Sequence, residues 1–312
     1  MEYLKDLDVT PILIGILFSV VTLYWWCSRR SYKLPPGPIG LPLVGYLPFL
    51  DKESFKSFKK LAEKYGNIFS LYLGRNLTVV LSDYKLIKDA FNQQALLNRP
   101  PHIFDFHPDG FGFVGSNGEE WLEQRRYTMK IMRDIGLGKS QWENLLAAEV
   151  EEVRDWLKTH DGKPVNIYRS LSASVSNNMT TLVFGKRLPA GDPTRILVDD
   201  NVEAVTRVFL QSGFVSFFPN LLALFAKIRF TQLGKDRKLM VQFSNFLKKQ
   251  VETRKKALIA EDSEDVFIDG YLKEIKKNKQ RNIENSFNEE NLIGSCQAMV
   301  SAGSETTRTA IL

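Results

Sequence analysis

Cysteine and histidine are scarce in this sequence. Its 312 residues include two cysteines, Cys27 and Cys296, and three histidines, which are His102, His107 and His160. Neither cysteine has a Cys-x-x-Cys partner or a nearby histidine, and the histidines are scattered along the chain. We therefore expect no disulfide framework, no structural zinc site and no metal site built on histidine.

Acidic residues are outnumbered by basic ones, but only modestly. The net charge is +6 and the isoelectric point is about 9.1, so acidic surfaces are expected partners. Nucleic acid is not expected, because the lysine and arginine clusters lie in helical stretches without aromatic residues for base stacking. The hydrophobic share of 44% and the charged share of 25% are those of a globular protein.

Charge is absent from residues 9–28, which read VTPILIGILFSVVTLYWWCS. Twenty such residues in a helix match the ~30 Å core of a bilayer, and Tyr24, Trp25 and Trp26 suit its interface. A cleaved signal peptide is the alternative, but this stretch is long for one and has no basic region before it. The sequence predicts a single transmembrane helix over residues 9–28.

The charges on either side of this helix predict its orientation. The charged residues before the helix, at positions 1–8, are mainly acidic, whereas the charged residues after it, Arg29, Arg30 and Lys33, are basic. Positive residues favour the cytosolic side, so residues 1–8 are predicted to be a lumenal tail and residues 29 onward cytosolic. Residues 29–48 hold prolines at positions 35, 36, 38, 42 and 48, which predict a stiff, extended hinge.

Residues 49–312 are predicted to form a mainly α domain with a small β-sheet near its start. Two alternating runs around Gly74-Arg75-Asn76 predict a hairpin over 67–83. Helical periodicity is found over residues 53–66, 84–94, 119–138, 141–160, 164–184, 196–218 and 232–258. Residues 100–118 predict a long loop, and the apolar stretch 209–230 is either core or a second membrane-facing patch.

Three glycines in GFGFVG, which are Gly110, Gly112 and Gly115, match the spacing of a dinucleotide-binding loop. No strand precedes them, no helix pattern opens at the third glycine, and the flanking chain has no βαβ rhythm. We therefore interpret this segment as a loop that contains glycines and not as a nucleotide site.

Trp121 and Arg125 lie four residues apart in the predicted helix 119–138 and share one face of it. An indole N–H and a planar guanidinium side by side can bind an anionic group, although a buried Trp beside a solvated charge is the simpler alternative. Arg126, Lys130 and Arg133 form a basic stripe on another face, which suits an acidic partner.

The last helical stretch carries the chemistry that we find most informative. Ser286 and Glu289 form a capping-box pattern that predicts a helix start near 287. Farther along, a helix loosened at Gly303 lets the Thr306 hydroxyl donate to the Ala302 carbonyl oxygen, and leaves room for a small ligand.

Glu305 beside Thr306 then pairs a proton source with a relay donor. The alternative is that Gly303 ends one helix and Ser304 caps the next.

Taken together and in this order, the anchor, LPPGP at 34–38, WLEQRR at 121–126 and AGSETT at 302–307 resemble a membrane-bound cytochrome P450 of the microsomal kind. The resemblance implies haem b, electrons from NADPH through a flavin-containing reductase, and oxygen insertion into a small apolar substrate. The implied location is the endoplasmic reticulum membrane, with the catalytic domain in the cytosol.

The resemblance also assigns roles to residues. Trp121 and Arg125 would hold a haem propionate, Ala302 and Gly303 would lie over the distal face, and Thr306 with Glu305 would deliver protons. The stripe of Arg126, Lys130 and Arg133 would be part of the reductase docking surface.

One feature of the family is missing from this chain. Family members carry the iron-ligating cysteine downstream, after a Glu-x-x-Arg helix, and neither Cys27 nor Cys296 can replace it. We therefore expect a partial catalytic domain over 49–312 that is inactive by itself. The alternative is a non-catalytic, membrane-tethered helical binding protein or a shortened isoform.

Overall fold

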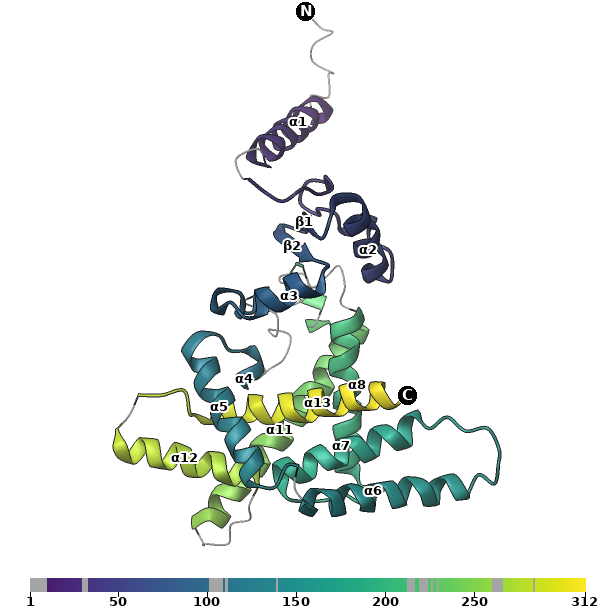
Figure 1. The fold of residues 1–312 in the computed structure, drawn as a ribbon, viewed down its shortest axis with the longest axis vertical. Helices are drawn as coiled ribbons and strands as arrows, with labels where there is room; N and C mark the ends of the chain where they lie inside the picture. Colours follow the sequence, from purple (N-terminus) through teal and green to yellow (C-terminus); the bar gives the residue numbers. More distant parts are fainter. Residues whose placement is uncertain are drawn as a thin grey trace, which may run out of the picture. The chain divides into compact units, whose positions relative to one another are not determined.

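The computed structural model describes residues 10–29, 33–100, 109, 112–138, 140–211, 217–218, 224–225, 227–228, 230–259, 266–282 and 284–312. The chain divides into two compact units, residues 1–96 and 97–312. Helices dominate both units, and Figure 1 labels them along the chain.

The first unit holds one small sheet and a few helices. Its elements are α1 (Thr10–Arg29), η1 (Leu47–Phe49), α2 (Ser54–Tyr65), β1 (Ile68–Leu73), β2 (Asn76–Leu81), α3 (Tyr84–Phe91) and η2 (Gln94–Leu96). The predicted helices over 53–66 and 84–94 are thereby confirmed in type. By length and mean hydropathy, no helix within the described ranges qualifies to cross a membrane.

The predicted hairpin is confirmed. β1 and β2 pair antiparallel, with Ile68 opposite Leu81 and Leu73 opposite Asn76. Gly74 has φ +61°, as a two-residue loop with glycine in first place requires. Phe69 and Leu71 of β1 are wholly or almost wholly buried, so this strand supplies the core of the first unit.

The described part of the proline-rich segment is tied to β1. The Ser70 backbone N–H donates to the Pro36 carbonyl oxygen at 2.9 Å, and the Ser70 hydroxyl donates to the Pro35 carbonyl oxygen at 2.7 Å. A Cβ on Gly37 would lie 1.7 Å from the Ser70 oxygen, so only glycine allows this approach. Residues 35–37 are therefore held against the sheet. The predicted extended backbone does not continue through the segment, because residues 41–45 form a turn and the 3-10 helix η1 begins at Leu47.

The second unit is helical throughout its described residues. Its helices are α4 (Gly112–Gly115), α5 (Gly118–Asp134), α6 (Ser140–Lys158), α7 (Tyr168–Phe184), α8 (Pro193–Gln211), α11 (Gln232–Ile259), α12 (Phe267–Arg281) and α13 (Glu289–Ile311). Five of them match the predicted stretches from 119 to 258. Sequence analysis missed α12, because its five basic side chains obscure a short apolar face that includes Phe267 and Tyr271.

Helix α13 lies at the centre of this unit and packs against α7, α8, α11 and α4. Leu292, Cys296 and Val300 on it are fully buried in the main core cluster. The helix is continuous through Gly303, so the alternative in which Gly303 ends a helix and Ser304 caps another is wrong. The Ser304 hydroxyl instead donates to the Val300 carbonyl oxygen at 2.6 Å.

The predicted capping box is also wrong. Asn288 caps α13 by accepting from the Asn291 N–H at 2.8 Å. Ser286 is drawn toward α5, where its backbone N–H donates to Glu123 at 3.0 Å and its hydroxyl accepts from Gln124 at 2.8 Å. A contact distant in sequence therefore displaced the local one.

Part of the glycine motif serves helix packing. Gly110 lies outside the described residues, but Gly112 has φ +47°, and a Cβ on it would lie 2.3 Å from the backbone nitrogen of Ser295. A Cβ on Gly294 would lie 2.5 Å from the nitrogen of Gly112. Because these two backbones touch, Gly112 and Gly294 join α4 to α13.

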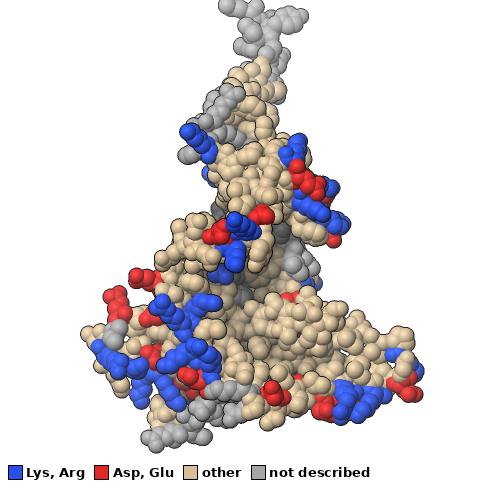
Figure 2. Space-filling view, viewed as in Figure 1, with Lys and Arg blue, Asp and Glu red and all other residues tan. Residues whose placement is uncertain are grey.

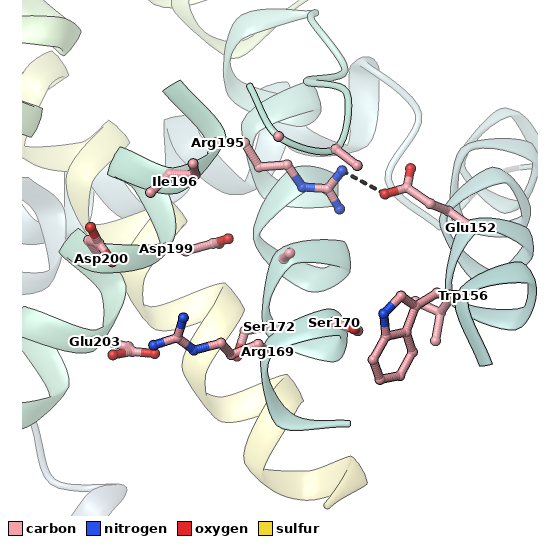
Figure 3. A pocket seen from close by; sticks show the side chains of 14 residues that line it. Glu152, Trp156, Arg169, Ser170, Ser172, Arg195, Ile196, Asp199, Asp200 and Glu203 are labelled. Atoms are coloured by element: carbon pink, nitrogen blue, oxygen red, sulfur yellow. Dashed lines mark hydrogen bonds and ion pairs between the residues drawn. The ribbon is translucent and has the colours of Figure 1, made fainter. Parts of the chain in front are cut away.

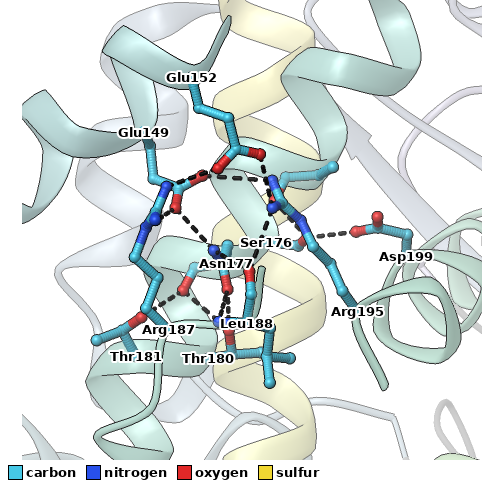
Figure 4. A network of polar contacts seen from close by, with 11 residues as sticks. Glu149, Glu152, Ser176, Asn177, Thr180, Thr181, Arg187, Leu188, Arg195 and Asp199 are labelled. Carbon is cyan, nitrogen blue, oxygen red and sulfur yellow. Dashed lines mark hydrogen bonds and ion pairs between the residues drawn. The ribbon is translucent and has the colours of Figure 1, made fainter. Parts of the chain in front are cut away.

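A buried polar network joins α6, α7 and α8 (Figure 4). Glu149 is 1% exposed and accepts from Asn177 at 2.7 Å, from Arg187 at 2.6 Å and from Arg195 at 3.4 Å. Asn177 also exchanges two hydrogen bonds with the backbone of Leu188, both at 2.9 Å. A buried carboxylate is tolerated only when it is paired in this way.

Two predicted segments fall mostly outside the described residues. Only 100, 109 and 112–118 of the loop 100–118 are described, and the apolar stretch 209–230 is described only in part. Within that part Leu224, Phe225 and Phe230 are exposed.

Two glycines of α13 give a matched test of this packing. Gly294→Ala is expected to destabilise the chain by ~1–3 kcal/mol, because the new methyl meets backbone that cannot move aside. Gly303→Ala places its methyl 2.5 Å from Sδ of Met179, a flexible side chain, and gains ~1 kcal/mol of helix propensity. Urea unfolding followed by circular dichroism measures both, and equal losses would contradict the contact geometry.

Candidate functional site

Helix α5 places Trp121 and Arg125 together, as the sequence predicts. The Arg125 guanidinium carbon lies 5.7 Å from the centre of the Trp121 ring. Trp121 is half-buried and Arg125 is exposed, and within the described residues Arg125 forms no ion pair. The two side chains therefore present several N–H donors on one face of the helix.

A neighbouring face of α5 is buried and fixes the orientation of the helix. Gln124, Thr128 and Ile131 are buried, and Tyr127 donates its hydroxyl to the Gly270 carbonyl oxygen of α12 at 2.7 Å. Arg126, Lys130 and Arg133 are exposed. These three cations lie away from the buried side chains of α5.

The C-terminal third of α13 exposes small side chains. Ala302 and Thr306 are exposed one turn apart, and Gly303 is half-buried. The Thr306 hydroxyl donates to the Ala302 carbonyl oxygen at 2.8 Å, as predicted from the sequence. Gly303 lies against Met179 of α7, so the missing side chain there makes room for a helix crossing.

Glu305 is engaged on another side of the helix. Its carboxylate accepts from the Arg308 guanidinium and from the Thr309 hydroxyl, the latter at 3.3 Å. No hydrogen bond joins Glu305 to Thr306 in this part of the chain. Glu305 and Thr306 are therefore neighbours in sequence whose polar groups point to different partners.

Arg308 is a residue that sequence analysis missed. It is 3% exposed, donates to the Ser172 hydroxyl at 2.7 Å, and its guanidinium lies 4.1 Å from the centre of the Tyr168 ring. The available signal was an arginine three residues after a glutamate on a helix of small residues. Arg308 anchors the Glu305 carboxylate to α7.

Ser172 also lines a hollow of about 360 Å³ between α6, α7 and α8 (Figure 3). Trp156, Arg169, Arg195 and Asp199 line the same hollow. Burial raises the pKa of Asp199 to about 6, against the lowering effects of the Ser176 hydroxyl and of Arg195. No sequence motif singled out this hollow, because its residues come from three separate helices.

The donor set on α5 fits a flat group with an anionic edge, since Trp121 and Arg125 offer N–H donors that nothing described in the chain occupies. Ala302 and Thr306 are exposed and have short side chains, so a flat ring could approach the backbone of α13 on this face. Cys296 does not fit as a metal ligand, because it is fully buried and burial raises the pKa of its thiol well above the usual range. Within the described ranges, no group of three or more metal-ligating side chains is assembled.

The Arg308–Glu305 pair predicts a measurable coupling. Arg308→Met removes the partner of Glu305 and leaves the Ser172 hydroxyl without its donor, so we expect a loss of ~2–4 kcal/mol in the free energy of unfolding. Glu305→Gln in the Arg308→Met background is expected to recover part of that loss. A double-mutant cycle by urea unfolding measures the coupling, and strictly additive effects would rule the pair out.

Asp199 predicts a pH dependence of stability. Its folded pKa of about 6 lies above the ordinary value of 3.8, so its stabilising contribution is present below pH ~4 and is lost as the pH rises through 6. Asp199→Asn keeps an acceptor for Ser176 and removes the charge. We expect this variant to be more stable than wild type by ~2–3 kcal/mol at pH 7.5 and equal to it near pH 3; the opposite trend would refute the burial effect.

Comparison of the sequence with known proteins identifies the family of this chain. The family model for Cytochrome P450 matches residues 35–312. Cytochrome P450 18a1 of Drosophila melanogaster is 32% identical over 96% of this chain and 58% of its own length. Cytochrome P450 2C7 of Rattus norvegicus is 30% identical over 98% of this chain and 62% of its own length, and Cytochrome P450 2J2 of Homo sapiens is 30% identical over 96% and 60%.

The chain thus spans about 60% of the length of these curated relatives. The family model nevertheless covers nearly the whole chain after the predicted anchor, including both α5 and α13. The resemblance first drawn from four short motifs is confirmed, and the chain belongs to the cytochrome P450 family.

Proposed function

We propose that this chain carries the membrane anchor and the distal half of a haem-thiolate monooxygenase, which inserts one oxygen atom of O2 into a small apolar substrate. The observation that carries the proposal is the family match through α13 together with the exposed Ala302–Thr306 face on that helix. Family members use haem b, and we propose the same cofactor here, with electrons from NADPH.

Trp121 and Arg125 are the residues that we propose hold a haem propionate. Their donors lie on one face of α5, and a propionate is a carboxylate that a planar guanidinium can bind through two N–H groups. Ala302 would let the ring approach α13, since its side chain ends at Cβ and is exposed. Gly303 is proposed to lie beside the ring as well, although its own Cβ direction is filled by Met179 of α7. When bound, haem supplies the oxygen-activating chemistry.

Proton handling falls to α13 in this proposal. Thr306 holds a hydroxyl proton on the exposed face, and Ala302 fixes that hydroxyl through its carbonyl oxygen at 2.8 Å. Glu305 is the nearest carboxylate along the helix and is held by Arg308. We propose that Thr306 relays a proton and that Glu305 supplies it after its carboxylate has left Arg308 and has taken up a proton from solvent.

We propose that residues 9–28 anchor the protein in the endoplasmic reticulum membrane, with residues 1–8 lumenal, 29–48 as the hinge and 49–312 cytosolic. Helix α1 is twenty residues long, and its apolar side chains, such as Leu13, Leu17 and Phe18, are more than 60% exposed. Leu224, Phe225 and Phe230 support a second membrane contact within 209–230. A flavin-containing reductase is proposed to dock near Arg126, Lys130 and Arg133.

The non-catalytic alternative, a membrane-tethered helical binding protein or shortened isoform, is not favoured. The family match extends over both α5 and α13, which supply the proposed cofactor-binding and proton-handling residues. No separate feature among the described residues points to a different ligand for this face.

Haem binding tests the proposal. The 312-residue chain is expected to show no haem–thiolate absorption band when it is titrated with haem, and Cys296→Ala is expected to change nothing, because that thiol is buried and protonated. A protein that continues to the downstream cysteine of its relatives is expected to show the band.

In that longer protein, Arg125→Ala should lower haem affinity at least ~10-fold, whereas Arg169→Ala on α7 serves as a matched control. A stable thiolate band from the 312-residue chain, or haem affinity unchanged by Arg125→Ala, would contradict the assignment.

A further inference from the structure

Exposed basic side chains gather on two neighbouring helices of the second unit. Figure 2 shows lysine and arginine side chains massed over α5 and α12. Nine of these residues are exposed, namely Arg125, Arg126, Lys130, Arg133, Lys273, Lys276, Lys277, Lys279 and Arg281. The two helices also carry six acidic residues, four on α5 and two on α12. The positive excess therefore lies on α12, whose five cations outnumber Glu274 and the buried Asp269.

These cations are largely without acidic partners. Within the described residues, only Lys277 forms an ion pair, with Glu274 on its own helix at 3.4 Å. By contrast, the buried Arg195 and the half-buried Arg207 are paired, with Glu149 and Asp236 respectively. A basic surface without internal partners keeps its charge available for a second molecule.

The two helices form one rigid surface. A Cβ on Gly270 would lie 1.9 Å from Cδ1 of Ile131, so α12 crosses α5 in direct contact. Tyr127 reinforces the crossing by donating to the Gly270 carbonyl oxygen at 2.7 Å, and burial raises the pKa of that phenol, with Glu274 and Asp134 adding to the effect. The phenol therefore keeps its proton and the bond persists at neutral pH.

A hollow of about 300 Å³ follows the crossing, with Lys130 on its α5 side and Lys273 on its α12 side. Its floor includes Ile131 and Gly270, and Asp134 and Glu274 also line it. Lys130 and Lys273 line this hollow from the two helices, and Asp134 and Glu274 offset part of their charge, so we place the partner's carboxylates on the exposed cations around it.

We propose that α12 and α5 together form a single docking surface for an acidic protein. The inference rests on the proposed function, in which that protein is the flavin-containing reductase, and it extends the docking site from α5 to α12. Met129 is the one large apolar side chain exposed on the described parts of these two helices. A membrane surface would call for several such side chains beside the cations, so the surface favours a protein partner.

Charge reversal on each helix tests this surface. The 312-residue chain, held in nanodiscs of neutral phosphatidylcholine, is titrated with purified microsomal flavoprotein reductase. Lys276→Glu with Lys279→Glu alters α12, and Arg126→Glu with Lys130→Glu alters α5. We expect each pair to raise the Kd ~10-fold at low ionic strength and less than ~2-fold in 1 M salt, where the Debye length is ~3 Å.

Lys235→Glu with Lys238→Glu is the matched control. Both lysines are exposed and belong to α11, which is not one of the two helices of the proposed surface. They lie near the N-terminal end of α11, and Lys238 is about 30 Å from the other end of that helix. We expect the control to leave the Kd within ~2-fold of wild type. An equal loss in the control would reduce the effect to net charge and overturn the inference.

The remaining outcomes separate the inference from the proposed function. Loss of affinity with the α5 pair alone would overturn the role of α12 and leave the reductase proposal standing. No binding by the wild-type chain would refute the reductase proposal itself. Vesicles containing phosphatidylserine form a second arm, and binding there that both variants lose, with reductase affinity unchanged, would assign the surface to lipid.

Discussion

The close packing of α13 against its neighbours is the constraint on which the second unit depends. Leu292, Cys296 and Val300 are fully buried among α7, α8 and α11, and Gly294 brings the backbone of α4 into contact with the helix. Because the first two-thirds of α13 is fixed in this way, its last third has one possible rotation. That rotation exposes Ala302 and Thr306 and turns Arg308 into the protein.

Polar contacts refine what packing establishes. The buried Arg308 draws the Glu305 carboxylate toward α7 and away from the Thr306 hydroxyl, which is satisfied by its own helix. In the proposed monooxygenase this separation has a consequence, because an acid held by a buried arginine has to be released before it can supply a proton. A buried ion pair contributes little net stability, so stability alone does not account for the Arg308–Glu305 pair. In the proposed enzyme its role would be to control when Glu305 is released.

Charge on this protein is divided between two uses. One group of charges forms ion pairs inside the protein and holds α6, α7 and α8 together; it consists of Glu149, Arg187 and Arg195. The exposed cations of α5 and α12 have almost no internal partners and are left for another molecule. Trp121 and Arg125 lie on α5 as well, so the helix that would bind the cofactor also belongs to the surface proposed to receive its electron donor.

The sequence by itself determined the features that depend on local interactions. Helical periodicity located most helices, Gly74 fixed the hairpin, and the four-residue spacings gave the Trp121–Arg125 pair and the bond from Thr306 to Ala302. Four motifs in order also sufficed to indicate the family.

Tertiary structure decided the rest, because contacts distant in sequence outweighed local signals. Ser286 forms hydrogen bonds with Glu123 and Gln124 of α5, and Asn288 caps α13 in its place. Helix α13 also continues through Gly303, where it packs against Met179 of α7. The α7 partners of Arg308, Tyr168 and Ser172, lie more than 130 residues earlier in the chain, so neighbouring residues gave no sign of them.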